Sequence, residues 1–132
     1  MAEPHRIDPE GRPYDPSTFR PKPEVDPATF FSLDLRVGRI VGVEPFPEAR
    51  EPAWKIAVDL GPLLGVRWTS AKVTNYGQQE LVGRTVVAAV NLGPKRIAGF
   101  VSELLLLGGL EPDGTVRLLA PDTGLPPGAP VA

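Results

Sequence analysis

The 132-residue sequence predicts an all-β domain: a small five-stranded barrel with one short helix between its third and fourth strands, and with extensions at both ends. Three observations support this prediction. Five segments alternate apolar and polar residues or are rich in β-branched residues, as strands are. Glycine and proline separate these segments. The one segment suited to a short helix lies between the third and fourth strands. With 42% apolar residues, the chain is long enough for a single core.

The five predicted strands are closely spaced, at residues 33–43, 54–60, 66–74, 84–92 and 98–108. The first changes phase near Gly38, which predicts a bulge or bend in a long strand. The helix is expected within residues 75–83 and ends at Gly83. Four successive leucines, 104–107, predict that the last strand is buried on both faces. Five strands with the helix after the third is the order of an OB-fold, a partly open Greek-key barrel.

The two ends of the chain differ from the predicted barrel in composition. Seven of the 17 prolines fall within residues 1–29, so residues 1–28 are expected to be an extended or disordered leader. Residues 29–132 form the predicted domain with a C-terminal extension. The flanking segments PATFFSL and GTVRLLAP carry apolar residues that a five-stranded barrel need not cover. Such segments are typical of interfaces, which predicts a homodimer.

Several classes of function are disfavoured by the composition. The chain has no cysteine and a single histidine, His5, and it shows no metal-ligand spacing or glycine-rich phosphate loop. Neither an enzyme nor a bound cofactor or metal is therefore expected. The N-terminus lacks the apolar run of a signal peptide, and no apolar stretch approaches the length of a membrane span. The expected location is the cytoplasm.

Cations are placed where an OB-fold binds its ligands. The loops between strands one and two and between strands four and five flank the binding face of this fold; here they span residues 44–53 and 91–98. Residues 30–110 carry nine Lys and Arg against seven Asp and Glu, so any binding of phosphates must be local. Among the cations on these loops or on the first three strands, six are the candidates for such contacts: Arg36, Arg50, Lys55, Lys72, Lys95 and Arg96.

Two further pairs of residues each have two interpretations. Asn91 and Ser102 flank the second loop and either order it through backbone hydrogen bonds or contact a ligand. Trp54 and Trp68 lie at apolar positions of the strand alternation. Their rings could stack on bases, but a place in the barrel core or at its rim is favoured.

The motifs LDLRVGRI, TSAKVT and LVGRTVVAAVNLGPKRIAGFVSELLLLG together resemble the tRNA-binding domain family of OB-folds. The likeness is strongest to the free-standing bacterial CsaA-type proteins, homodimers described as export-related chaperones, and Glu103 fits their Ser-Glu pair. The resemblance implies binding of tRNA or structured RNA through the candidate residues Arg36, Arg50, Lys55, Lys72, Asn91, Lys95, Arg96 and Ser102.

The resemblance also implies a second function of a different class. In this alternative the same cleft binds unfolded or exported polypeptides, as a molecular chaperone does, with Phe46, Ile97 and Phe100 as the apolar contacts. Salt distinguishes the two functions, because phosphate binding weakens steeply with salt and burial of apolar peptide does not.

Overall fold

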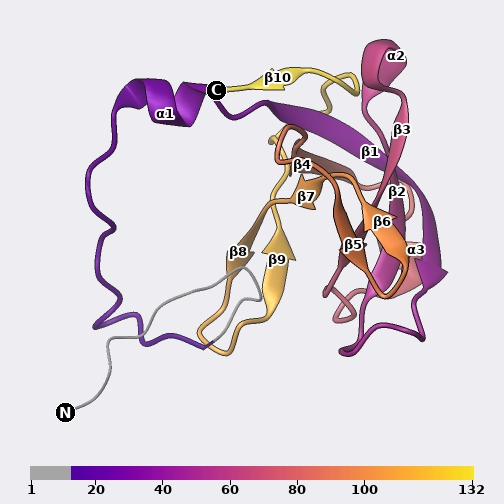
Figure 1. Cartoon of the computed structure of the whole chain (residues 1–132), viewed down its shortest axis with the longest axis horizontal. Coiled ribbons are helices and arrows are strands. Elements are labelled where there is room, and N and C mark those ends of the chain that lie inside the picture. The colour runs from indigo at the N-terminus through magenta and orange to yellow at the C-terminus, as the bar shows by residue number, and fades with distance from the viewer. Residues whose placement is uncertain (1–12) are drawn as a thin grey trace.

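The structure is a computed structural model that describes residues 13–132 and shows an antiparallel barrel with two projecting hairpins and an N-terminal arm (Figure 1). Its strands are β1 (Leu35–Pro45), β2 (Trp54–Asp59), β3 (Val66–Ala71), β4 (Thr85–Ala89), β5 (Lys95–Ile97), β6 (Phe100–Ser102), β7 (Leu105–Leu106), β8 (Gly108–Leu110), β9 (Val116–Leu118) and β10 (Pro130–Val131). Its helices are α1 (Pro27–Phe31), α2 (Gly61–Leu64) and α3 (Gln78–Leu81). His5 lies outside the described residues.

The main sheet closes into a nearly complete barrel. Its strand order is β3-β2-β1-β4-β7, and β10 pairs with the start of β1. The remaining gap is narrowed where the Glu103 N–H donates to the Trp68 carbonyl oxygen at 2.8 Å, which brings the chain after β6 against β3. Helix α3 lies between β3 and β4 in the chain, as predicted, and Gly83 follows it with φ of 88°. The predicted OB-fold is confirmed.

Strand β1 is long and bends, and the bend lets it pair with β4 near its start and with β2 near its end. The register against β2 shifts between Ile40 and Gly42, three residues after the predicted position at Gly38. Gly38 has a different role. A Cβ atom at this position would lie 2.5 Å from Cγ1 of Val58, so only glycine allows β1 to approach β2 this closely. The phase change therefore predicted the bulge correctly but placed it about three residues too early in the strand.

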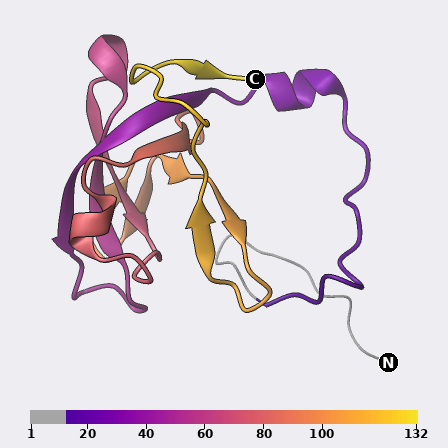
Figure 2. The same cartoon turned by 180° about the vertical axis from the view of Figure 1, so that it is seen from behind.

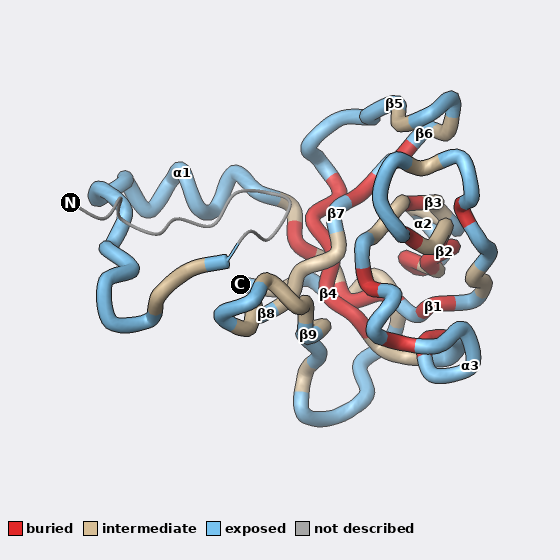
Figure 3. The backbone as a smooth tube through the Cα atoms, turned by 90° about the horizontal axis from the view of Figure 1, so that it is seen from below, coloured by how far each residue is buried: buried red, intermediate tan, exposed pale blue. Residues whose placement is uncertain are grey.

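The core fills the barrel interior and follows the predicted alternation in β2. Ile56 and Val58 have no exposed surface, and Trp54 packs against the same cluster. The cluster is completed by apolar side chains from β1, from β4, from the segment around α3 and from the residues that follow β2 and precede β7: Ile40, Leu60, Val73, Tyr76, Leu81, Val86, Ala88, Val90 and Leu104. Figure 3 shows the buried positions concentrated in the barrel, while α1 is exposed along its whole length.

Three local predictions were wrong. The predicted fifth strand is divided into β6, which pairs with β5, and β7, which pairs with β4. Because the chain changes partner between them, only Leu104 of the four leucines is buried, and Leu105 is 47% exposed. The predicted loop 91–98 contains β5. Helices α1 and α2 were not predicted, since each is only about one turn long.

None of the helices within residues 13–132 is long and apolar enough to cross a membrane.

The N-terminal arm, residues 13–33, stands clear of the barrel in both Figure 1 and Figure 2. Residues 16–33 are all exposed. The arm is attached at Tyr14, whose N–H donates to the Pro112 carbonyl at 2.9 Å and whose hydroxyl donates to the Leu110 carbonyl at 2.8 Å. The arm thus contacts the β8–β9 hairpin at Tyr14 and the chain after β4 at Ser32, whose carbonyl accepts from Asn91.

Deleting residues 1–26 is expected to lower the melting temperature by only about 3–5 °C, because two partly exposed hydrogen bonds worth about 0.5 kcal/mol each are lost. A thermal denaturation scan of the shortened and full chains measures this change. Tyr14→Phe, which removes only the hydroxyl bond, should account for about half of it. A drop of more than about 10 °C would show that the leader is part of the fold.

Candidate functional site

The β5–β6 hairpin carries the two adjacent cations. Residues 98 and 99 form its two-residue turn, with φ of 47° at Ala98 and 81° at Gly99, the positive values that the favoured hairpin turns require. Lys95 and Arg96 are exposed. Arg96 Nη1 donates to the Gly99 carbonyl at 3.2 Å, and neither side chain forms an ion pair with any residue in 13–132. Both positive charges are therefore available to a ligand.

Ala98 is the one described non-glycine residue with positive φ, a conformation in which an L-residue is strained. Asn tolerates this conformation and Asn-Gly is a preferred hairpin turn. Ala98→Asn should therefore raise the free energy of unfolding by about 0.5–1 kcal/mol. Urea denaturation measures the change. Ala98→Val should have the opposite effect, and a destabilised Asn variant would contradict the turn geometry.

The β1–β2 loop, residues 46–53, is joined to this hairpin by an aromatic contact. The Phe46 and Phe100 rings lie 5.4 Å apart between centroids, and Nζ of Lys55 lies 4.9 Å from the first ring and 5.2 Å from the second. Phe46 is only 5% exposed, so it supports the surface from below, while Phe100 is half-buried. The β1–β2 loop and the β5–β6 hairpin thus meet at two aromatic rings that lie beneath the Lys55 ammonium.

The other two cations of this region differ in whether they form an ion pair. Lys72 Nζ lies 3.1 Å from Oε2 of Glu51, an exposed ion pair that links the segment after β3 to the β1–β2 loop. Arg50 is exposed, and no ion pair to it is found within residues 13–132. Arg50 and the hairpin cations thus lie on the two loops of the binding face, while Lys55 lies on β2 and Lys72 directly after β3.

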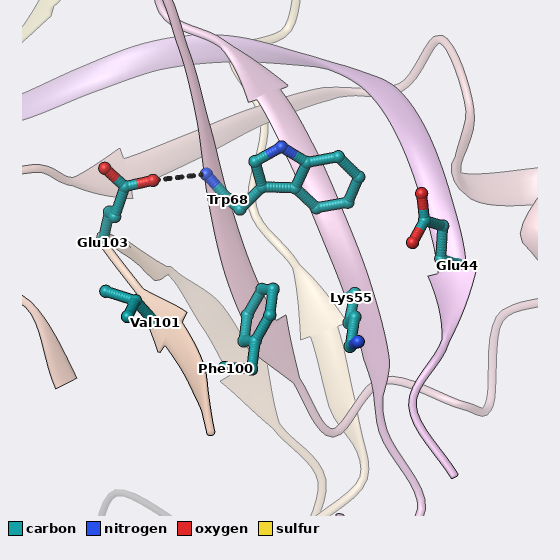
Figure 4. Close-up of a pocket in the computed structure, with 6 residues that line it drawn as sticks. All are labelled: Glu44, Lys55, Trp68, Phe100, Val101 and Glu103. Atoms are coloured by element: carbon teal, nitrogen blue, oxygen red, sulfur yellow. Dashed lines mark hydrogen bonds between the residues drawn. The ribbon is translucent and has the colours of Figure 1, made fainter. Parts of the chain in front are cut away.

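A hollow of about 250 Å³ opens on the outer face of the sheet beside these loops. Figure 4 shows Trp68 at its centre with Glu44 on one side of the indole and Glu103 on the other. One Glu103 oxygen, Oε1, accepts from the backbone N–H of Trp68 at 3.2 Å. The hollow is lined by Glu44, Lys55, Trp68, Phe100, Val101 and Glu103. It combines an aromatic floor with one cation and two carboxylates.

Arg36 lies away from this face, at the opposite end of β1. Its guanidinium is held by both carboxylate oxygens of Asp34 and by the Gly128 carbonyl at 3.3 Å. The hydrogen bond with Asp34 raises the pKa of the Arg36 guanidinium above its ordinary value. Arg36 thus fastens β1 to the C-terminal segment that includes β10.

Asn91 and Ser102 both make hydrogen bonds that order the backbone, one of the two interpretations open from the sequence. Asn91 accepts from the Asp34 N–H at 2.8 Å and donates to the Ser32 carbonyl at 2.9 Å. Ser102 is 8% exposed, and its hydroxyl lies 2.9 Å from that of Thr69 and accepts from the Ser70 N–H at 3.4 Å. Both side chains are occupied by the fold.

Trp68, for which a place in the barrel core or at its rim was favoured over stacking on bases, forms the floor of the hollow. Its register partner Ala57 and the neighbouring Lys55 show that it points outward, while Thr69 points into the core. Glu44 and Val101 were missed for the same reason: the face that each strand residue occupies is set by pairing. Residues 13–132 hold no group of three or more His, Cys, Asp or Glu side chains placed to bind a metal ion.

The match to a known family covers the whole barrel. The family model of the tRNA binding domain matches residues 35–130, from the start of β1 into β10. The chain belongs to the tRNA-binding domain family. The matched segment includes β8, β9 and β10, so the C-terminal extension is part of this tRNA-binding domain.

Solved structures of the same fold match most of this chain. A CsaA chaperone protein from Picrophilus torridus and a CsaA chaperone from Bacillus anthracis each show 42% identity and a TM-score of 0.79, over 83% of this chain and 100% of theirs. A MetRS-related protein from Pyrococcus horikoshii shows 26% identity and a TM-score of 0.75, over 84% and 100%.

Curated relatives include much longer enzymes. A methionine–tRNA ligase of Methanosarcina acetivorans is 31% identical over 107 residues, and methionine–tRNA ligase 1 of Sorangium cellulosum is 37% identical over 106 residues. These alignments cover 81% and 80% of this chain but only 15% of each ligase. The chain thus spans about a seventh of the length of the curated relatives it matches.

Proposed function

We propose that the chain is a non-catalytic, cytoplasmic module that binds tRNA or structured RNA as a homodimer. The observation that carries the proposal is two adjacent cations, Lys95 and Arg96, which form no ion pair within residues 13–132 and lie on a hairpin that meets the β1–β2 loop through the Phe46–Phe100 contact. Phosphate oxygens are the ligands that such exposed Lys and Arg side chains bind. Membership of the tRNA-binding domain family supports tRNA as the source of these phosphates.

The experiment that tests the RNA function is a titration of tRNA with the full chain at several salt concentrations. If about three to four phosphates are neutralised per site, the affinity should fall roughly thirty- to two-hundred-fold between 50 and 200 mM salt. No measurable binding at 50 mM salt would contradict the proposed function.

A second candidate function is a polypeptide-binding chaperone, favoured by the 42% identity to two proteins named CsaA chaperones. In that case Phe100 and Ile97, both half-buried, would contact an apolar peptide. Phe46 is covered by Phe100 and Lys55 and contributes indirectly. The apolar surface that these three residues expose is therefore small, which favours RNA as the ligand. Suppression of aggregation of an unfolded client protein at high salt would support the chaperone.

The homodimer is supported by apolar surface at the start of the domain. Helix α1 has no buried residue, and a helix of five residues is not stable alone in water. Phe30 and Phe31 on this helix are 43% and 68% exposed. Asn91 joins the chain after α1 to the end of β4, so Leu33 and Leu92 adjoin the same region. A second copy would cover this surface, and light scattering should give twice the 14.1 kDa of one chain.

A further inference from the structure

The indole of Trp68 is placed to stack on a planar ligand. The strand pairing sets Trp68 beside Ala57 on the outer face of the sheet, and a Cβ atom built at Gly42 would lie 4.0 Å from its Cη2. The ring therefore lies over two of the smallest residues, while the hollow opens beside it and Phe100 and Val101 form the adjoining wall (Figure 4). An aromatic surface of this kind stacks a nucleobase.

A cation and a carboxylate lie side by side in the same hollow without neutralising each other. Glu44 and Lys55 are direct partners across β1 and β2. Opposite charges in such positions commonly pair, but here the Lys55 ammonium lies over the Phe46 and Phe100 rings. No ion pair or hydrogen bond to the Glu44 carboxylate is found within residues 13–132. Both groups keep their hydrogen-bonding capacity for a ligand.

The order of these two groups matches the hydrogen-bonding edge of one base. Guanine presents an acceptor, O6, followed by two neighbouring donors, N1–H and N2–H. A carboxylate accepts two parallel donors and an ammonium donates to a carbonyl oxygen. Adenine and cytosine would set a ring-nitrogen acceptor against the carboxylate, and uracil has one donor between two carbonyls. Protein sites read unpaired bases through this edge and through stacking.

We propose that the hollow binds one unpaired guanine of the RNA, stacked on Trp68, with Glu44 accepting from N1–H and N2–H and Lys55 donating to O6. The volume of about 250 Å³ equals that of about eight water molecules, enough for a single base. The inference rests on the proposed RNA function and adds a base-specific contact to the phosphate contacts of Lys95 and Arg96.

The test measures binding of five labelled RNA pentamers, UUGUU, UUAUU, UUCUU, UUUUU and UUIUU, to the full chain by fluorescence anisotropy. Inosine lacks the N2 amino group of guanine. The guanine pentamer should bind about 5- to 150-fold more tightly than the adenine, cytosine and uracil pentamers, with the inosine pentamer between. Glu44→Gln should remove this preference, and Trp68→Leu should weaken binding of the guanine pentamer by a similar factor.

Glu48→Gln is the matched control, because Glu48 is exposed in the neighbouring loop and the substitution makes the same change of charge. It should keep the guanine preference. Equal binding of all pentamers, or a preference that survives Glu44→Gln, would overturn the guanine site. If tRNA still binds with a steep salt dependence, only this inference fails; if tRNA does not bind, the proposed function fails. A lysine-containing peptide that displaces the guanine pentamer from the native chain but does not bind Glu44→Gln would assign the hollow to polypeptides instead.

Discussion

Reversing Lys95 and Arg96 to glutamate is expected to weaken tRNA binding about a hundredfold at 50 mM salt, since two charge-assisted contacts worth roughly 1.5 kcal/mol each are lost. The slope of log affinity against log salt should become shallower by about two units. The fold should remain intact, because both side chains are exposed and neither forms an ion pair within residues 13–132. Salt-dependent titration of tRNA measures both quantities.

The control for this experiment is Arg20→Glu with Lys22→Glu, which makes the same change of charge. Both residues are exposed in the N-terminal arm. The arm lies far from the β5–β6 hairpin in Figures 1 and 3. The control should bind tRNA with the native slope. Arg117 is less suitable, because it is paired with Glu111 and its reversal would disturb the β8–β9 hairpin. Native affinity and slope in the Lys95 and Arg96 variant would exclude the hairpin as the phosphate contact.

Phe30→Glu with Phe31→Glu is expected to convert the proposed dimer to monomers. Burial of a phenylalanine contributes about 1.5–3 kcal/mol, and a symmetric interface loses four of them, so the dissociation constant should rise at least a thousandfold. Because α1 contributes no buried residue to its own chain, each monomer should keep its barrel. Analytical ultracentrifugation over a range of concentrations measures the change.

Leu63→Glu with Val82→Glu is the corresponding control for the dimer. These residues are 88% and 52% exposed, in α2 and directly after α3, on the side of the barrel away from α1 (Figure 1). This variant should remain dimeric. If it dissociates while the α1 variant does not, the interface lies at the opposite end of the molecule. A native chain that is monomeric at tens of micromolar would contradict the dimer itself.

The order of strands could be predicted from the sequence because alternation and punctuation are local. Residues 54–60 alternate without ambiguity, and the structure places Ile56 and Val58 in the core as expected. The position of the helix followed from the length of the segment between two strands and from Gly83. The fold then predicted which loops flank the binding face, and Arg50, Lys95 and Arg96 became candidate residues because they lie on these loops.

The contents of the hollow could not be predicted, because they depend on contacts between distant segments. In β3 either Trp68 or Thr69 could face the core by alternation, and size favours the tryptophan. The structure reverses this choice. Thr69 is buried because its hydroxyl bonds to Ser102 and to the Leu104 carbonyl. That satisfies a polar group in the core and turns Trp68 outward. The β5–β6 hairpin was missed because Ala98-Gly99 lacks the usual Asn-Gly signal.

The measurement that tests the central claim most directly is sequencing of the RNA that copurifies with the full chain at 50 mM salt. We expect tRNA to dominate the bound RNA and to be released as the salt is raised to 200 mM, as phosphate contacts require. Absence of RNA at 50 mM, together with polypeptides that stay bound at 200 mM, would contradict an RNA-binding module and support the chaperone.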